Sequence, residues 1–334
     1  MIEESMEAAI SYKAWCWHEK GEPTGLRMEE RTLTAPAPGE VWVANRAIGL
    51  NPVDWKLIES GGRDWLPGHV PGVDGAGVIA GVGAGVDLPV GMRVAYHQSL
   101  SLDGSFAEFT RMQAETLLRV PEGLSDDVAA CLPCPSLTAW QAVEKLPSLA
   151  GHDVLVIGAG GAVGLLLVQL ALARHARVWA TASPGHHTQL LALGVTGVFD
   201  YRSESWKDAL QASLGPRKLF AAFDTVGRAH AATLAPLIGF NGHIVCIQGR
   251  LEAPAWPAFS SALSMHEVAL NAIHGQGLAS DWARWRDAGE KVLASACIGN
   301  LKLPTVERYA FAALPQALQA LKFGTTASKR VVRV

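Results

Sequence analysis

The chain has 334 residues, of which 49% are hydrophobic and 18% charged, and its formal net charge is −3. This length allows two domains with separate cores, and the composition excludes an intrinsically disordered chain. Lysine and arginine are spread along the chain, whereas a nucleic-acid-binding protein usually carries a basic face.

The N-terminal segment MIEESMEAAISYK (residues 1–13) is acidic and lacks the apolar core of a signal peptide. We expect this short N-terminal segment to be disordered and, in the absence of an export signal, the protein to be cytoplasmic. The five cysteines, at positions 16, 131, 134, 246 and 297, are an odd number. This usage is typical of reduced thiols rather than of a disulfide framework.

Residues 12 to about 130 read as short β segments separated by turns. The runs VWVANRAIGL (41–50), GVIAGVGAGV (77–86) and GMRVAY (91–96) are the clearest of them. Glycine and proline punctuate the stretches between these runs, as they do in loops. The pattern predicts a β-rich, barrel-like domain.

A helix start follows at SDDVAACL, where Ser125 is the expected N-cap and two acids occupy the first turn. Cys131 and Cys134 then form a C-x-x-C motif. A single such pair supplies only two of the four ligands of a structural zinc site. We therefore interpret the two residues as buried structural thiols.

From here strands and helices alternate, which predicts a doubly wound parallel sheet. Apolar strand runs are expected at 153–158, 177–182, 197–202, 219–227 and 242–249, with an edge strand at 268–275. Two amphipathic helices, at 280–295 and 313–324, and the short β pieces 307–311 and 329–334 complete the chain. We expect domains at 1–130 and 131–275.

The stretch VLVIGAGGAVGLLLVQLALA (154–173) is long and apolar enough for a membrane span. Its glycines favour instead a strand, a tight turn and a helix. The spacing G-x-x-G-x-x-G, at 158, 161 and 164, places free backbone N–H groups at a helix N-terminus, where they can bind a pyrophosphate. Gly158, Gly161, Ala162, Val163 and Gly164 are therefore predicted to bind a dinucleotide.

NAD-specific sites carry an acid about 20 residues past the glycines. Here the second strand ends in WATASPGHH, with no carboxylate before Asp200. Ser183, His186 and His187 could donate to a 2′-phosphate, with Tyr201 and Arg202 approaching from the next strand. This pattern favours NADPH. The alternative is that the two histidines only begin a solvated helix.

The order of these parts resembles the medium-chain dehydrogenase/reductase superfamily over nearly the whole chain. The motifs that carry the resemblance are GLNPVDWK (49–56), VPGVDGAGVI (70–79), GSFAEF (104–109), PCPSLTAW (133–140) and the glycine loop. They are most similar to those of the zinc-free quinone oxidoreductase and enone reductase branch. The resemblance implies an α/β fold with a GroES-like β-rich barrel domain and a Rossmann domain. It also implies that residues 276–334 return to the first domain.

Zinc-dependent relatives have a cysteine at the position of Asn51 and a His-Glu pair at Val73-Asp74. Only Cys134 matches a third ligand position, and the four-cysteine lobe of the structural zinc is absent. A catalytic zinc needs three protein ligands. We therefore expect no metal and, without a Lewis acid, no simple alcohol oxidation.

By resemblance, Asn51, Asp54 and Thr138 lie beside the nicotinamide. Lys56 is a candidate proton donor to the acceptor carbonyl, although a salt bridge to an acid is an equal alternative. Asp54 is expected to order its loop rather than to move protons.

The resemblance also implies the remaining cofactor contacts. The nicotinamide end should be lined by Val226, Gln248, Gly249, Ile273 and His274. A lysine that binds the adenosine phosphate in relatives is matched here by His187, and Arg330 is a second candidate for this phosphate.

The predicted function is NADPH-dependent, zinc-independent reduction of quinones or α,β-unsaturated carbonyl compounds. Alternatives are a reductase of another activated alkene, such as an enoyl thioester or haloacrylate, and a catalytically weak NADPH-binding protein with a structural or RNA-contacting role. Relatives in this branch imply a homodimer that pairs along the edge strand. No membrane or nucleic-acid partner is expected.

Overall fold

The computed structural model describes residues 10–324 and 328–334. Most of the N-terminal segment that is predicted to be disordered, residues 1–9, therefore lies outside the described residues. The chain divides into two compact units. Unit 1 comprises Met1–Cys134, His274–Asn300 and Thr305–Val334, and unit 2 comprises Pro135–Ile273 and Leu301–Pro304. The predicted boundaries at 130 and 275 lie close to these divisions.

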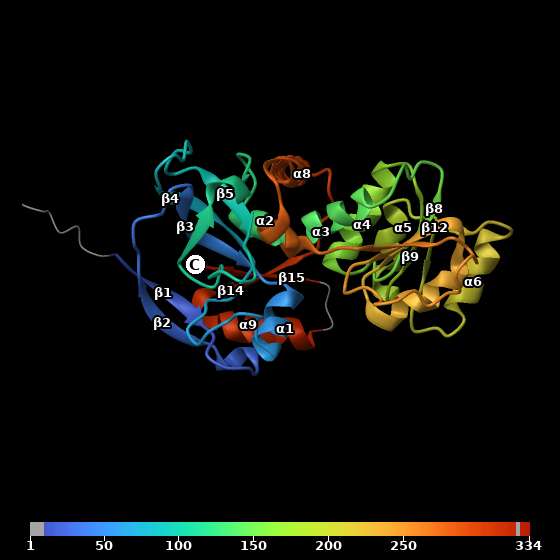
Figure 1. The fold of residues 1–334 in the computed structure, drawn as a ribbon, viewed down its shortest axis with the longest axis horizontal. Coiled ribbons are helices and arrows are strands. Elements are labelled where there is room, and N and C mark those ends of the chain that lie inside the picture. The colour runs from blue at the N-terminus through green and yellow to red at the C-terminus, as the bar shows by residue number, and fades with distance from the viewer. Residues whose placement is uncertain (1–9, 325–327) are drawn as a thin grey trace, which may run out of the picture. The chain divides into compact units, whose positions relative to one another are not determined.

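Unit 1 is built on a seven-stranded sheet in the order β14-β15-β3-β4-β5-β7, with β6 also paired to β3. These strands are β3 (Glu40–Gly49), β4 (Asp74–Val82), β5 (Arg93–His97), β6 (Phe109–Gln113), β7 (Leu118–Arg119), β14 (Val306–Ala310) and β15 (Lys329–Arg333). All pairs are antiparallel except β14 with β15. The C-terminal strand β15 lies between β14 and the N-terminal strand β3 (Figure 1).

A two-stranded ribbon and several helices complete unit 1. The ribbon is β1 (Ser11–Cys16) with β2 (Arg27–Thr32), and the helices are α1 (Pro52–Ser60), α2 (Asp126–Cys131), α7 (Ile273–Gln276), α8 (Ala279–Cys297) and α9 (Leu314–Phe323). The predicted cap is confirmed, because the Ser125 side chain accepts a hydrogen bond from the backbone of Val128. Helix α3 (Pro133–Glu144) begins at the end of unit 1 and continues into unit 2.

Unit 2 contains a six-stranded parallel sheet in the order β10-β9-β8-β11-β12-β13, which confirms the doubly wound fold. The strands are β8 (Asp153–Val156), β9 (Arg177–Thr181), β10 (Gly197–Phe199), β11 (Leu219–Asp224), β12 (Ile238–Cys246) and β13 (Ser264–Glu267). The chain runs outward from β8 in one direction and then from β11 in the other. This reversal makes the carboxyl ends of β8 and β11 the switch point where such sheets bind ligands.

The helices of unit 2 connect these strands. They are α4 (Ala162–Ala173), α5 (His187–Ala192) and α6 (Trp206–Leu214). The apolar stretch at 154–173 is thus a strand, a turn and a helix, and all four residues of β8 are buried. Among the described residues, no helix is both long and apolar enough to cross a membrane.

The edge strand predicted at 268–275 is wrong. The edge is β13, whose residues pair with His243–Cys246 of β12, and the chain leaves the sheet at Val268. Residues 270–276 instead form a 3-10 turn (Leu270–Ala272) and the short helix α7. The shorter, more polar run SMHE (264–267) makes the edge instead.

Candidate functional site

Asn51 and Asp54 organise the start of α1 in unit 1. Asn51 is the N-cap, and its backbone N–H donates to Asp54 Oδ2 at 2.7 Å. The backbone N–H of Val73 donates to Asp54 Oδ1 at 3.2 Å. Asp54 thus joins the start of α1 to the loop before β4, as expected of a residue that orders this region.

Burial, together with the nearby charge of Asp74, raises the pKa of Asp54 to about 7. The two backbone donors and the ammonium group of Lys329 act in the opposite direction. A carboxyl group that titrates near neutrality therefore lies next to Asn51.

This titration predicts a pH-dependent stability. Asp54 holds its proton more tightly in the folded chain, so its contribution is complete below about pH 4 and is lost as the pH rises through about 7. Between about pH 4 and about pH 7, the unfolding free energy of the wild type should fall relative to that of Asp54→Asn, by up to roughly 1.4 kcal/mol per pH unit, and it should level off at higher pH. Urea unfolding at several pH values measures this difference. Parallel pH profiles would contradict the assignment.

Lys329, which the sequence analysis did not single out, is a buried cation at this site. Its side chain is 5% exposed, and Nζ donates to the carbonyl of Leu50 at 2.8 Å and to Asn51 Oδ1. An ammonium group only donates, so it fixes the orientation of the Asn51 amide. The amide nitrogen of Asn51 then donates to Asp74 Oδ2 at 2.9 Å.

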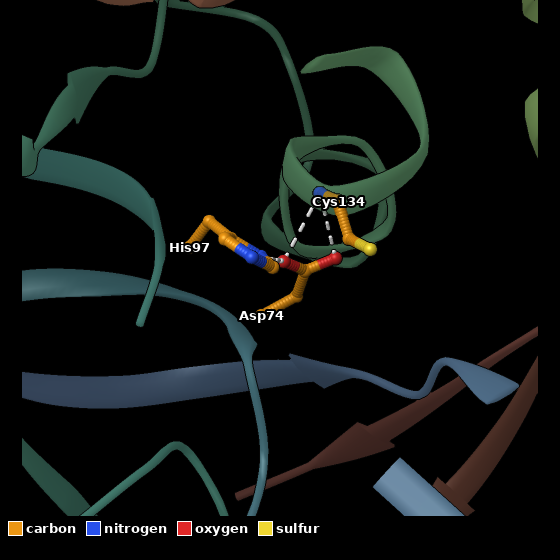
Figure 2. Close-up of side chains that lie close together, drawn as sticks. All are labelled: Asp74, His97 and Cys134. Carbon is orange, nitrogen blue, oxygen red and sulfur yellow. Dashed lines mark hydrogen bonds and ion pairs between the residues drawn. The ribbon is translucent and has the colours of Figure 1, made fainter. Parts of the chain in front are cut away.

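Asp74, at the start of β4, is fully buried and accepts hydrogen bonds on both carboxylate oxygens (Figure 2). The backbone N–H of Cys134 donates to Oδ1 and Oδ2 at 3.1 and 3.0 Å. His97, at the end of β5, lies 2.9 Å from Oδ1 through Nδ1 and is 3% exposed. Cys134 itself is half-buried, so only Cys131 of the pair is the buried thiol that was expected.

Asp74, His97 and Cys134 form a cluster of possible metal ligands, whereas the sequence predicts no metal. One ligand atom from each residue lies within 4.8 Å of the others, and zinc accepts all three types of ligand. However, both Asp74 oxygens are already engaged by N–H donors, and the Lys329 ammonium lies on the other side of Asn51. A buried cation and a saturated carboxylate disfavour a second positive charge. This donor set does not fit a zinc ion.

Two other residues of unit 1 occupy positions that weaken their predicted roles. Lys56, the candidate proton donor, is exposed on α1, with its Nζ 5.7 Å from the ring centre of Trp55. Arg330 in β15 is 4% exposed, with Nε 3.4 Å from Glu307, so this guanidinium is buried beside an acid. A buried paired arginine is poorly placed to receive a phosphate.

The glycine loop lies at the switch point of the unit 2 sheet. Gly158 has φ +72°, and a Cβ there would meet Thr225 Oγ1 at 2.4 Å, so only glycine fits. Gly164 packs α4 directly on this turn, since an added Cβ would lie 2.3 Å from the Gly158 carbonyl oxygen. At Gly161, the N-cap of α4, a Cβ would meet only that oxygen, at 3.5 Å. Such an open backbone at a helix N-terminus is suited to an approaching pyrophosphate.

Two further loops of unit 2 lie at the neighbouring strand ends. Val226 follows β11 and is 59% exposed, and its N–H donates to Asp224 at 3.0 Å. Gly227 contacts the Gln248 carbonyl, which a Cβ at position 227 would approach to 2.3 Å, and Arg228 N–H donates to Gly249 at 3.2 Å. The structure thus brings the predicted residues after β11 and β12 together.

The candidate phosphate residues begin the segment after β9. His187 Nε2 lies 3.1 Å from the Ala182 carbonyl oxygen, so a backbone contact already engages one ring nitrogen. The ring of His186 lies against the glycine loop, since a Cβ on Gly160 would meet its Cδ2 at 2.5 Å. Ser183 is half-buried, and Tyr201 is 54% exposed beside Arg202.

Three predicted cofactor contacts lie at the ends of the units. Thr138 is on α3 in unit 2 and is 8% exposed. Ile273 is the last residue of one segment of unit 2, and His274 opens the next segment of unit 1. The ring centre of His274 lies 6.2 Å from that of His97.

A cavity of about 790 Å³ also opens in unit 1, but it does not include the residues described above. Its lining comes from the β4–β5 turn, the segment from β6 to β7 and one face of α8, and includes Val86, Met92, Leu117, Arg286 and Glu290. The cavity is lined by both acidic and basic side chains, and none of the predicted catalytic or cofactor-binding residues is among them.

Comparison with known proteins places this fold and site in a family context. Residues 37–122 match the model of the alcohol dehydrogenase GroES-like domain, and residues 162–293 match that of zinc-binding dehydrogenases. Quinone oxidoreductase of Rattus norvegicus is 30% identical over 70% of this chain and 73% of its own. The 2-methylene-furan-3-one reductase of Solanum lycopersicum is 32% identical over 75% of this chain.

The chain spans 66% of the tomato reductase and only 8 to 14% of several mycobacterial synthases that it also matches. Among solved structures, the quinone oxidoreductase of Pseudomonas syringae pv. tomato DC3000 superimposes with a TM-score of 0.85, at 24% identity. That match covers 97% of this chain and all of the other, and it supports the two-domain fold.

Proposed function

Because the chain belongs to the medium-chain dehydrogenase/reductase superfamily, in its zinc-free quinone and enone oxidoreductase branch, we propose that it reduces quinones or α,β-unsaturated carbonyl compounds with NADPH. The observation that carries the proposal is the glycine loop at the switch point of the parallel sheet, with the open backbone of Gly161 at the start of α4. The names of the rat and tomato relatives support the acceptor class.

When bound, NADPH supplies the hydride, and the protein supplies orientation and electrostatics. The turn from Gly158 to Gly164 would hold the pyrophosphate, and the loops at Val226 and Gln248–Gly249 the nicotinamide half. The strand that ends at Thr181 offers no carboxylate to repel a 2′-phosphate, which favours NADPH over NADH.

Reduction of an activated alkene does not need a metal to polarise an alcohol oxygen. The site in unit 1 supplies a fixed amide on Asn51 and a buried ammonium on Lys329 instead. Such preorganised donors stabilise charge that develops during reaction. This arrangement supports zinc-independent catalysis.

The test is NADPH oxidation by the purified protein with a panel of quinones and enones, with and without a chelator. We expect turnover that the chelator does not change, and no oxidation of primary alcohols with NADP⁺. Absence of turnover with every acceptor, despite NADPH binding, would contradict the proposal and favour a catalytically weak cofactor-binding protein.

His186 and His187 allow the phosphate prediction to be tested in unit 2. His187→Ala should weaken NADPH binding by about tenfold, the value of one hydrogen bond to a charged group, and leave NADH binding unchanged. His186→Ala is the comparison, because this ring lies against Gly160. Titration of each variant with both cofactors measures the selectivity. Equal loss of NADH and NADPH binding in His187→Ala would indicate a structural role.

A further inference from the structure

The proposed reduction requires a proton as well as a hydride, and Lys56 is not the buried group best placed to give it. Three groups near Asn51 carry protons: Asp54, Lys329 and His97. Both oxygens of Asp54 accept backbone N–H bonds, and Lys329 is held by Leu50 and Asn51. His97 differs, because only one of its two ring nitrogens is engaged.

The tautomer of His97 follows from its partner. Asp74 Oδ1 lies 2.9 Å from Nδ1, and the Asp74 carboxylate is held by Asn51 and by the backbone of Cys134. A carboxylate only accepts, so Nδ1 carries the hydrogen. The side-chain hydrogen bond of His97 described above is made through Nδ1, which leaves Nε2 as the nitrogen that can gain or lose a proton.

His97 lies near two residues of unit 1 that are predicted to contact the nicotinamide. Through Asp74 it is joined to Asn51, and its ring centre is 6.2 Å from that of His274. Trp285, which is 1% exposed, packs at 6.0 Å from the same ring. Since the side chain of His97 is 3% exposed, a proton held there is largely shielded from bulk water.

We propose that His97 is the general acid of the reaction, with Asp74 as the residue that positions it. The inference rests on the proposed function. After hydride has reached the β-carbon of an enone, the pair of electrons from the broken π bond resides on the α-carbon and the carbonyl oxygen. A new bond forms between the α-carbon and the Nε2 proton, the N–H electrons remain on Nε2, and water later restores the proton.

Several ionisable groups lie around His97. They are Asp74 on β4, Cys134 on α3 and His274 on α7, with Asp54 on α1 and Lys329 on β15 grouped around Asn51. Burial lowers the pKa of His274 to about 4, so this neighbour is uncharged at neutral pH. The Asp74 carboxylate is therefore the nearest compensating charge for a protonated His97.

The variant His97→Asn keeps an amide donor for Asp74 and removes the titratable nitrogen. We expect kcat with an enone to fall by about 10²–10⁴-fold, the usual contribution of a general acid, with little change in KM. The pH dependence of kcat should also differ between the wild type and the variant. The matched control is His18→Asn, which breaks a remote pair with Glu29 and should retain activity.

Two readouts separate proton delivery from a structural role. With an α-substituted enone, the wild type should give one α-epimer and His97→Asn a mixture, because water then protonates either face. Nuclear magnetic resonance of ¹⁵N-histidine-labelled protein without substrate should show a protected Nδ1–H that is absent from the variant.

The outcomes distinguish this inference from the proposed function. If the wild type reduces enones and His97→Asn keeps both rate and α-stereochemistry, only the assignment of His97 fails. If the wild type binds NADPH but reduces no acceptor, both proposals fail. A cobalt–thiolate absorption band that Cys134→Ser abolishes would also overturn the assignment, since the metal would replace the proton on Nδ1.

Discussion

Substitution of Gly164 by alanine is expected to destabilise unit 2 by about 1–3 kcal/mol and to abolish cofactor binding. The added Cβ would lie 2.3 Å from the Gly158 carbonyl oxygen and 2.7 Å from Ala159 Cα. Both are backbone atoms that cannot rotate away. Helix α4 would have to move off the turn, which displaces the N–H groups that face the pyrophosphate.

Gly161→Ala provides the contrasting variant. Here the Cβ meets only the Gly158 oxygen at 3.5 Å, an ordinary contact, and φ is −80°, which alanine adopts without strain. We expect normal thermal unfolding but weaker NADPH binding, because the methyl group stands where the phosphate approaches. Gly21→Ala, with open space around it, is the control. Unchanged NADPH affinity in Gly161→Ala would argue against this loop as the phosphate site.

Lys329→Met should have the largest effect on the stability of unit 1. The substitution keeps the length of the apolar stem but leaves the Leu50 carbonyl and Asn51 Oδ1 without their buried donor. We expect a loss of about 3 kcal/mol in the free energy of unfolding. Lys291→Met is the control, since this lysine is 73% exposed beside Asp287 and should change stability by less than about 0.5 kcal/mol.

The same substitution has a second, independent readout. The ammonium of Lys329 holds the pKa of Asp54 down against the effect of burial. Its removal should therefore move the pH range in which stability declines to higher values. Urea unfolding of Lys329→Met across pH measures the shift. An unchanged range, together with unchanged stability, would show that Lys329 does not act on this cluster.

Local patterns explain why much of the fold could be predicted from the sequence. The strand, turn and helix at 153–173 lie within one short segment, and the glycines that allow their contact are adjacent in sequence. The alternation that follows predicts the parallel sheet for the same reason. The prediction of a strand at 268–275 was wrong because the position of the edge strand depends on burial, hydrogen bonding and the pairing of β13 with β12. An apolar run in the sequence does not reveal these.

The polar cluster in unit 1 could not be predicted in this way. Asp74, His97 and Lys329 come from β4, β5 and β15, and only the sheet brings them together. One available signal was the pair Lys329-Arg330, directly before the apolar Val331 and Val332 of β15. A buried strand tolerates such residues only when they are paired, and the structure shows that Lys329, rather than Arg330, faces Asn51.

Titration of the intact protein with NADPH and NADH, followed by quenching of tryptophan fluorescence, tests the central claim most directly. The account predicts saturable binding of both cofactors, with NADPH bound more tightly, and a loss of affinity for both cofactors in Gly161→Ala. Tighter binding of NADH would contradict the 2′-phosphate assignment. Binding of neither cofactor would contradict the account as a whole, because the glycine loop would then have no dinucleotide to hold.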